Sequence, residues 1–345
     1  VEMSLGAEQA GAPIEAVDLL ISEATQVAGV PDAVDRYHQF REPCLAVTKS
    51  GRLVLVAQGR DKSDWSDRSG QDLVVTWSGD GGRTWSKPVL AVEHGNQSIC
   101  PQAEVYDRDE DALHALYNMF LWDYRGGQRA LKLHDGPQCR QYQITSHDGG
   151  ATWSEPREFT KVFGDAGPIV VFGSGRGIQL EHGKHAGRLI VPGSNRQGAW
   201  TNAAIFSDDR GKTWHEGGSA DRNVPGRKLN IRGVCKIAEL KGAYGQGILE
   251  MYARCSQLRV QAVSTDAGNS FSRFEVIEEM PAASCNGSLI SASLKDDREA
   301  LLACVPVGVA DVPRQDWNPV QARSRGMVYV SFDGGKTWPH RRTVM

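Results

Sequence analysis

The spacing of the histidines and glycines in this chain does not predict a metal site or a phosphate-binding loop. The nine histidines show no metal-ligand spacing, and the closest pair, His182 and His185, stands in a Gly-rich turn. The run GSGRG at 173–177 lacks the strand–glycine–helix context of a phosphate loop. We therefore expect no bound metal and no cofactor. Cysteines without a CxxC pair predict buried free thiols, with one or two disulfides as the alternative; they are Cys44, Cys100, Cys139, Cys235, Cys255, Cys285 and Cys304.

Two segments near the start of the chain contain arginine and aspartate residues that could act on a substrate. The motif FREP at 40–43 contains Arg41, and the polar loop GRDKSDWSDRSGQD at 59–72 contains Arg60, Asp64 and Asp67. A guanidinium group can hold a carboxylate through two charge-assisted hydrogen bonds, which its planar geometry favours over that of lysine. A positioned aspartic acid can transfer a proton to a reacting group. These residue types could therefore bind an anion and act on it.

A repeated octapeptide indicates the elements that position these residues. Its form is Ser-x-Asp-x-Gly-x-Thr-Trp, and its copies start at Ser78, Ser146, Ser207, Ser264 and Ser331, the fourth (STDAGNSF) being degenerate. Such a period indicates stacked units of one supersecondary type. Each copy also predicts a hairpin turn, because Asp can accept backbone N–H bonds, Gly permits positive φ and Trp anchors the turn on apolar neighbours. We read the repeat as structural and place no active site in it.

Short strand-like runs flank every copy of the repeat. CLAVTKSGRLVLVAQG, DLVVTW and SKPVLAVE make four strands around the first copy, and the same order recurs around the other four. Four antiparallel strands per repeat predict one propeller blade, so the chain is expected to be an all-β propeller with five visible blades. We expect residues 11–30 to supply a strand that helps close the ring. The whole chain, 1–345, is then a single propeller domain with residues 1–35 as an N-terminal closing segment and a sixth blade that is incomplete.

Composition excludes several classes of partner. With 345 residues and a formal net charge of −3, the chain shows no basic face for nucleic acid. No apolar stretch approaches the roughly 18 residues that a membrane span needs. The start, VEMSLGAEQAG, does not predict a signal peptide, although a processed mature protein would look the same. The compartment stays open, with a secreted or periplasmic location favoured over a cytoplasmic one.

Several segments together resemble one family of enzymes. YHQFREPCLAVTKSGRLVLVAQGR at 37–60 is similar to the start of sialidases (neuraminidases), whose signature is Tyr/Phe-Arg-Ile-Pro followed later by Gly-Arg. Here Glu42 replaces the usual Ile. FGSGRGIQL, GRLIVPGSN, YARCSQLRVQAVSTDAGNSF and CNGSLISA continue the resemblance, in order, over residues 37–340 with the repeat turns in register. The resemblance implies a six-bladed propeller that acts on sialylated glycans or other acidic sugars.

The resemblance also implies a set of site residues. In the family, three arginines from different blades hold the sugar carboxylate, and motif matching assigns these roles to Arg41, Arg254 and Arg323, with Arg325 as the runner-up for the third. The family's general acid is an Asp in the loop after Gly-Arg. Asp64 matches it best and Asp67 is the alternative. Arg60 is expected to pair with nearby carboxylates and to contact the sugar.

The nucleophile pair of the family is not found in this sequence. Sialidases use a Tyr nucleophile in place of a carboxylate, and its high pKa calls for a Glu partner as base. The family's Tyr position falls past Met345, and Val234 stands at the Glu position; Glu239 or Glu250 could substitute only after a register shift. We expect an exo-α-sialidase-like glycoside hydrolase. A non-catalytic sialoglycan-binding propeller, or a related glycosidase or lyase acting on another acidic sugar, is the alternative.

Overall fold

The computed structural model describes most of the chain from Tyr37 onward and shows an almost entirely β protein. The described residues are 37–61, 70–93, 95, 97–120, 139–159, 171–172, 175–195, 201–227, 229–231, 234–242, 247–255, 258–281, 283, 285–295, 297–308 and 323–344. One short 3-10 helix covers Gly183–His185. No helix in these ranges has the length and hydropathy needed to span a bilayer.

The strands form five antiparallel blades of four, as the repeat predicts. The first blade contains β1 (Tyr37–Val47), β2 (Leu53–Asp61), β3 (Gln71–Ser78) and β4 (Val89–Val92), and the second contains β5 (Ser98–Asp107), β6 (Ala112–Phe120), β7 (Cys139–Ser146) and β8 (Arg157–Glu158). A parallel contact between Gln71 and Ser98 joins these two blades into one sheet.

The other three blades repeat this order. The third contains β11 (Ile178–Gln179), β12 (Leu189–Asn195), β13 (Thr201–Ser207) and β14 (His215–Ser219), and β9 (Val171–Phe172) pairs with β12. The fourth contains β15 (Cys235–Leu240), β16 (Ile248–Arg254), β17 (Leu258–Ser264) and β18 (Glu275–Pro281), and the fifth contains β19 (Ser288–Ser293), β20 (Glu299–Val307), β21 (Arg325–Ser331) and β22 (His340–Thr343). A further short strand, β10 (Gly175–Arg176), pairs in parallel with β5.

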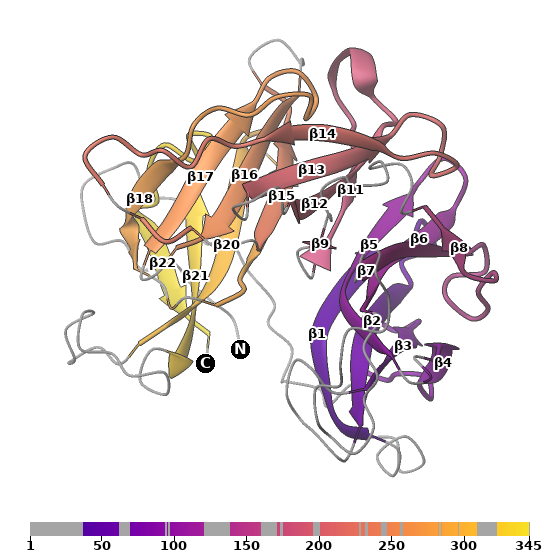
Figure 1. Ribbon diagram of the computed structural model, residues 1–345. Helices are drawn as coiled ribbons and strands as arrows, with labels where there is room; N and C mark the ends of the chain where they lie inside the picture. Colours follow the sequence, from indigo (N-terminus) through magenta and orange to yellow (C-terminus); the bar gives the residue numbers. More distant parts are fainter. Residues whose placement is uncertain are drawn as a thin grey trace.

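The blades follow one another around a central channel. The first strand of each blade lies innermost, and contacts between these strands run from β1 to β5, β11, β15 and β19. Figure 1 shows the resulting arc, with the first and fifth blades at its two ends. The expected all-β propeller architecture is confirmed. The strand expected within residues 11–30 lies outside the described residues, so the closing segment and the single-domain assignment stay predictions.

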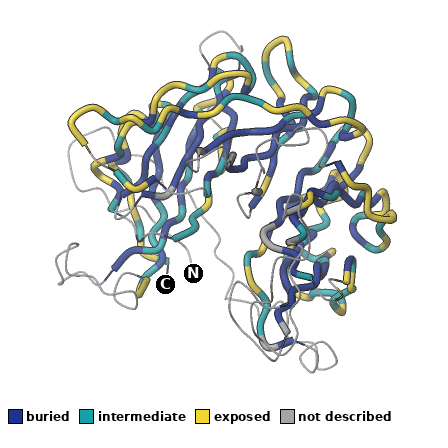
Figure 2. Tube along the Cα trace, in the orientation of Figure 1, coloured by how far each residue is buried: buried dark blue, intermediate teal, exposed yellow. Residues whose placement is uncertain are grey.

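The apolar cores lie between neighbouring blades. One cluster, for example, joins Ile190 of the third blade to Met251 of the fourth, and another joins Val54 of the first to Leu113 of the second. In Figure 2 the strands are mostly buried and the turns at their ends are mostly exposed. Because each core needs two blades, a blade is stable only where it has a neighbour.

One face at each end of the arc carries exposed apolar side chains. On β1 the buried Ala46 packs on the second blade, whereas Leu45 and Val47 on the opposite face are 43% and 49% exposed. Ile290 on β19 is 44% exposed. Exposed apolar side chains in regular alternation are typical of a surface that another element covers. Val47 and Ile290 line the central channel, and Leu45 is a position against which the expected sixth blade would pack.

Each repeat closes on itself through the same hydrogen bonds. In the second copy the Ser146 hydroxyl donates to Asp148 Oδ1 (2.8 Å) and accepts the Gly150 N–H (2.9 Å). The Asp148 carboxylate accepts the N–H and the hydroxyl of Thr152 at 2.9 and 2.6 Å. The degenerate fourth copy makes the same bonds, with Ser270 in the place of Thr. The predicted turn role of the repeat is confirmed, including its Asp acceptor.

The same turns also join each blade to the blade before it. The second glycine of the turn, or its equivalent, lies against a residue of the preceding blade: Gly150 against Val54, Gly211 against His114, Gly268 against Ile190 and Gly335 against Gln261. Arginines of the preceding blade reinforce three of these joints by donating to turn carbonyls: Arg52 to Asp148, Arg157 to Gly211 and Arg188 to Ala267. The repeat therefore sets the packing of one blade on the next.

The described cysteines agree with the expectation of free thiols. Cys44, Cys235, Cys255, Cys285 and Cys304 are all free, and the first three are buried. Burial raises the pKa of the Cys44 and Cys235 thiols, so these groups stay protonated and pack as small apolar side chains.

The joint between blades can be tested with a pair of glycine substitutions. Gly150 and Gly51 both have positive φ (88° and 78°), but a Cβ on Gly150 would lie 2.8 Å from Val54 Cγ1, whereas one on Gly51 would meet nothing within 4 Å. Gly51→Ala should cost about 1 kcal/mol of unfolding free energy through backbone strain alone. Gly150→Ala should cost about 1–3 kcal/mol more because it overpacks the joint. Equal losses in denaturant titrations would contradict the role of the turn.

His114 makes the joint between the second and third blades sensitive to pH. It is buried against Gly211, its Nδ1 lies 3.0 Å from Thr145 Oγ1, and burial lowers its pKa to about 4, with Asp107 opposing the shift. The unfolded chain, with an ordinary histidine pKa near 6.5, binds the proton first. Stability is therefore present above pH ~6.5 and is lost as the pH falls toward ~4.

We predict that lowering the pH from 7 to 5 removes about 2 kcal/mol of unfolding free energy through this one group. His114→Gln should flatten the pH dependence between ~4 and ~6.5 by that amount, whatever its effect at pH 7. Chemical denaturation of both proteins across this range is the measurement. Parallel pH profiles for the two would show that His114 does not carry the effect.

Candidate functional site

Strand direction brings the predicted arginines to one face of the ring. Arg41 lies near the start of β1, Arg254 ends β16, and Arg323 comes two residues before β21 begins. In an antiparallel blade the start of the first strand, the end of the second and the start of the third share one edge. The repeat turns follow the third strands and therefore lie on the other face. We call the two faces the arginine face and the turn face.

The structure describes the predicted site residues to different extents. Arg41 and Arg323 are exposed on the arginine face. For Arg254 only the backbone, at the end of β16, is described, and Asp64 and Asp67 lie outside the described residues. The strands that flank their loop, β2 and β3, end and begin on the arginine face. The assignments of these residues stay predictions.

Arg325, the runner-up for the third arginine, has a structural partner. Its Nε and Nη2 donate to the carbonyl of Gly308 at 3.1 and 2.6 Å, and the residue is half-buried. Arg323 is exposed beside it. The choice between Arg323 and Arg325 for the third arginine stays a prediction.

Arg60 lies beneath the surface. It is 1% exposed, and its Nη2 donates to Gln58 Oε1 at 3.3 Å. The expected pairing of Arg60 with carboxylates and its contact with the sugar stay predictions. A guanidinium group this deeply buried needs hydrogen-bond partners inside the protein, and Gln58 is one of them.

A bulge in β1 orients Arg41. The register of β1 on β2 shifts between Arg41 and Cys44, and Glu42 between them has φ 54°, a left-handed conformation that is uncommon for a residue other than glycine. The Glu42 carbonyl accepts a hydrogen bond from Gln102 Nε2 at 2.5 Å. Strained backbone persists only where the surroundings fix it. Gln102 is one such fixing group.

A chain of buried polar groups runs from this bulge to the base of the 62–69 loop. Gln102 Oε1 accepts from Gln58 Nε2 at 3.0 Å, and Gln58 Oε1 accepts from Arg60. Gln58 and Gln102 are fully buried. The chain therefore ties the segment that carries Arg41 to the segment that leads into Asp64 and Asp67. We call it the glutamine chain.

The channel beneath the arginine face holds further charged groups. The Lys236 ammonium reaches Gly175 so closely that a Cβ there would lie 2.6 Å from Nζ. Burial lowers the pKa of Lys236, and Cys44, Cys235 and Glu42 oppose the shift. Burial also raises the pKa of Glu104, which is 0% exposed, well above its usual value, against the charge of Arg176.

Neither residue considered as a substitute for the missing Glu lies on the arginine face. The β15–β16 register is continuous from Cys235–Ala253 to Leu240–Ile248, so the shift that this substitution required is absent. Glu239 is five residues from Val234, roughly 17 Å along an extended strand. Its carboxylate accepts the N–H groups of Glu181 and His182 on the turn face.

Glu250 is buried in the joint between the fourth and fifth blades, away from the arginine face. It is 2% exposed, lies 3.7 Å from where a Gly335 side chain would begin, and burial raises its pKa to about 8. It therefore stays protonated at neutral pH inside the joint between the fourth and fifth blades. Within the described residues no cluster of three or more His, Cys, Asp or Glu side chains could hold a metal ion.

Sequence reasoning missed the groups that support the predicted site. Gln58, Gln102, Glu104 and Lys236 have no motif of their own. A signal for two of them exists in SICPQAEVYD, the sequence of β5, where Gln102 and Glu104 are polar residues at alternate positions of a buried strand. Polar side chains on one face of an innermost strand indicate a polar channel.

Comparisons with known proteins agree with this architecture. The family described as BNR repeat-like domain matches residues 110–345. The chain is 29% identical over 321 residues, 88% of its length, to a sialidase of Micromonospora viridifaciens, and 34% identical over 235 residues, 60% of its length, to sialidase-4 of Mus musculus. It spans 46% and 44% of these relatives, so it covers about half the length of each.

A solved structure has the same fold. The intramolecular trans-sialidase from Ruminococcus gnavus, determined in complex with oseltamivir carboxylate, superposes with a TM-score of 0.68 at 19% identity. The match covers 90% of this chain and 86% of that one. At this identity the likeness establishes the fold alone.

The glutamine chain predicts energetic coupling between two residues that are 44 positions apart. Gln58→Leu and Gln102→Leu should each cost about 1–3 kcal/mol of unfolding free energy, because each leaves one buried group of the other amide, Gln102 Oε1 or Gln58 Nε2, without this partner. The double variant should cost less than the sum by about 0.5–3 kcal/mol. A double-mutant cycle by urea denaturation measures the coupling; additive losses would mean that the two amides do not depend on each other.

Proposed function

Because this chain belongs to the sialidase superfamily of BNR-repeat propellers, we propose that it is a glycoside hydrolase of the exo-α-sialidase type. Its substrates would be glycoconjugates with terminal sialic acids, which it would hydrolyse from the non-reducing end. The observation that carries the proposal is the common face of Arg41, Arg254 and Arg323, which come from the first, fourth and fifth blades.

The arginines would bind the carboxylate of the sugar. Sialic acid carries this group on its anomeric carbon, and a guanidinium holds a carboxylate by charge-assisted and often bidentate hydrogen bonds. Arg41 is supported from below by the glutamine chain, which keeps the bulge at Glu42 in one conformation. A preorganised set of side chains loses less conformational entropy when the ligand binds, so more of the interaction free energy appears as affinity.

An aspartic acid in segment 62–69 would donate the proton to the leaving oxygen. Asp64 is our choice as general acid and Asp67 is the alternative. Arg60, which precedes this segment on β2, is buried and donates to Gln58. Such a proton transfer contributes about 10²–10⁴-fold to the rate.

The residue at position 234 supports a second candidate function. Sialidases pair a Tyr nucleophile with a Glu base, and Val234, which cannot accept a proton, stands at the Glu position. A clamp without this base would bind sialoglycans and leave them intact. The second candidate is therefore a sialoglycan-binding propeller.

Turnover of a fluorogenic sialoside separates the two functions. We expect the chain to release the fluorophore, Asp64→Ala to lower kcat by about 10²–10⁴, and Arg41→Ala to lower kcat/KM by about 10–100 through loss of a charge-assisted contact. Arg83→Ala, an exposed arginine of the first repeat turn on the opposite face, is the matched control and should behave as wild type.

Two results would count against the hydrolase. Sialoglycan binding without turnover would favour the binding propeller, and full activity in Arg41→Ala would refute the clamp. If Asp67→Ala abolishes turnover while Asp64→Ala retains it, the general acid is Asp67.

A further inference from the structure

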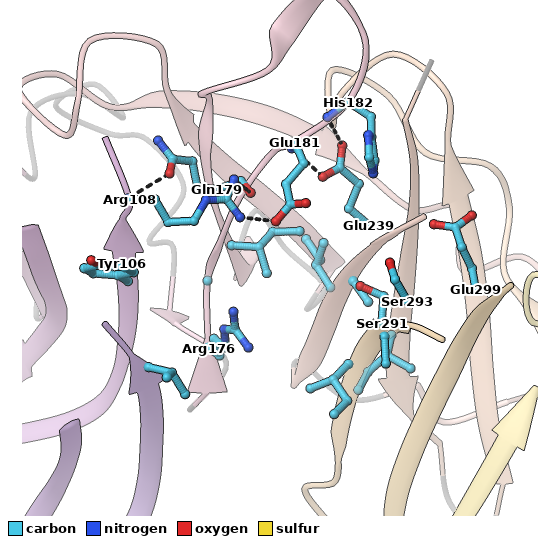
Figure 3. Close-up of a pocket in the computed structure, with 18 residues that line it drawn as sticks. Tyr106, Arg108, Arg176, Gln179, Glu181, His182, Glu239, Ser291, Ser293 and Glu299 are labelled. Carbon is cyan, nitrogen blue, oxygen red and sulfur yellow. Dashed lines mark hydrogen bonds and ion pairs between the residues drawn. The ribbon is translucent and has the colours of Figure 1, made fainter. Parts of the chain in front are cut away.

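A pocket opens at the turn-face end of the channel. It has a volume of about 280 Å³ and is lined by residues of all five blades. Its polar side chains, shown in Figure 3, come from the ends of the innermost strands and the turns that follow them. They are Tyr106, Arg108, Arg176, Gln179, Glu181, His182, Glu239, Ser291, Ser293 and Glu299. We call it the channel pocket.

The channel pocket is separate from the predicted clamp. It is lined by Val47, at the last residue of β1, whereas Arg41 is six residues earlier on the same strand. Six residues of extended strand span roughly 20 Å. A ligand of one or two sugar rings therefore cannot occupy both places at once.

Part of the pocket wall is rigidly held. Arg108 pairs with Glu181 and donates from Nη2 to the Gln179 carbonyl at 3.2 Å. The Glu239 carboxylate accepts the N–H groups of Glu181 and His182 at 2.6 and 3.1 Å. These bonds fix both carboxylates without using all of their acceptor capacity. A ligand would meet preformed acceptors.

Three other polar groups in the pocket have no partner within the described residues. The Arg176 guanidinium projects from β10 into the open centre, and Ser291 and Ser293 lie across from it on β19 (Figure 3). No hydrogen bond or ion pair from the described part of the chain occupies these three side chains, and all three are exposed. A guanidinium and two hydroxyls around one cavity match a ligand with an anionic group and several hydroxyls.

The local charges leave Arg176 available for an anion. Its neighbour across the β5–β10 pairing is Glu104, and burial raises the pKa of that carboxyl, against the charge of Arg176. Glu181, the other nearby carboxylate, is paired with Arg108. Neither carboxyl group makes a direct ion pair with Arg176 within the described residues, so the guanidinium can still form direct hydrogen bonds to an anion. The side chains of Ile178, Ile237 and Leu289 supply an apolar wall beside it.

We propose that the channel pocket is a second ligand site, which binds a small polyhydroxylated carboxylate of the size of a hexuronic acid. Arg176 holds the carboxylate, Ser291 and Ser293 donate to or accept from ring hydroxyls, and Glu239 and Glu181 accept from others. The apolar wall covers the C–H face of the ring. The site does not depend on the activity proposed for the arginine face.

Binding of sodium D-glucuronate to the full chain, followed by saturation-transfer NMR, tests the site, with D-glucose as the uncharged control. We expect saturable binding of glucuronate and weaker binding of glucose. Arg176→Gln should weaken glucuronate binding by about tenfold or more, because it removes the charge-assisted pair. Ser293→Ala should weaken it by a smaller factor, and this variant serves if Arg176→Gln does not fold.

Arg83→Ala is the matched control, since it removes an exposed arginine of the first repeat turn that lines neither the pocket nor the predicted clamp. Glucuronate binding should survive in this variant. Loss of binding in Arg41→Ala together with retention in Arg176→Gln would place the ligand in the clamp and overturn the proposal. Absence of saturable glucuronate binding, or glucose binding of equal strength, would also overturn it.

Discussion

The contact between each repeat turn and the preceding blade is the constraint on which the rest of the structure depends. The turn is held by its own Ser–Asp–Thr hydrogen bonds, so its second glycine arrives at the neighbouring blade in a fixed position. Only a residue without a side chain leaves room there, as the approach of Gly150 to Val54 shows. Repeated around the ring, this contact sets the angle between blades and seals the four apolar cores between them.

This constraint also connects architecture to chemistry. The predicted arginines come from the first, fourth and fifth blades, so their separation depends on how the intervening blades pack. The repeat turns lie on one face and control that packing, while the arginines lie on the other. The glutamine chain adds a local constraint, because it ties the bulge before Cys44 to the base of the 62–69 loop. If the proposed clamp forms, the packing of the blades sets the distances between its arginines, and the glutamine chain holds the backbone beside Arg41.

The sequence predicted the repetitive part of the structure well and the supporting part of the site poorly. The turn formed by the octapeptide can be predicted from local sequence, because its Ser, Asp and Gly interact within eight residues. The period of the repeat then predicts the blades. The burial of Arg60 and the contact of Gln58 with Gln102 depend on the packing of two blades, which no local pattern reports. The positions of Glu239 and Glu250 depended on a strand register that the sequence left open, and the observed register keeps both away from the arginine face.

A crystal structure of this chain with bound N-acetylneuraminic acid would test the central claim most directly. We predict that the sugar carboxylate lies on the arginine face, with its oxygens within about 2.7–3.2 Å of guanidinium nitrogens of Arg41, Arg254 and Arg323. A sugar bound with its carboxylate away from Arg41 would contradict the clamp, and with it the proposed function.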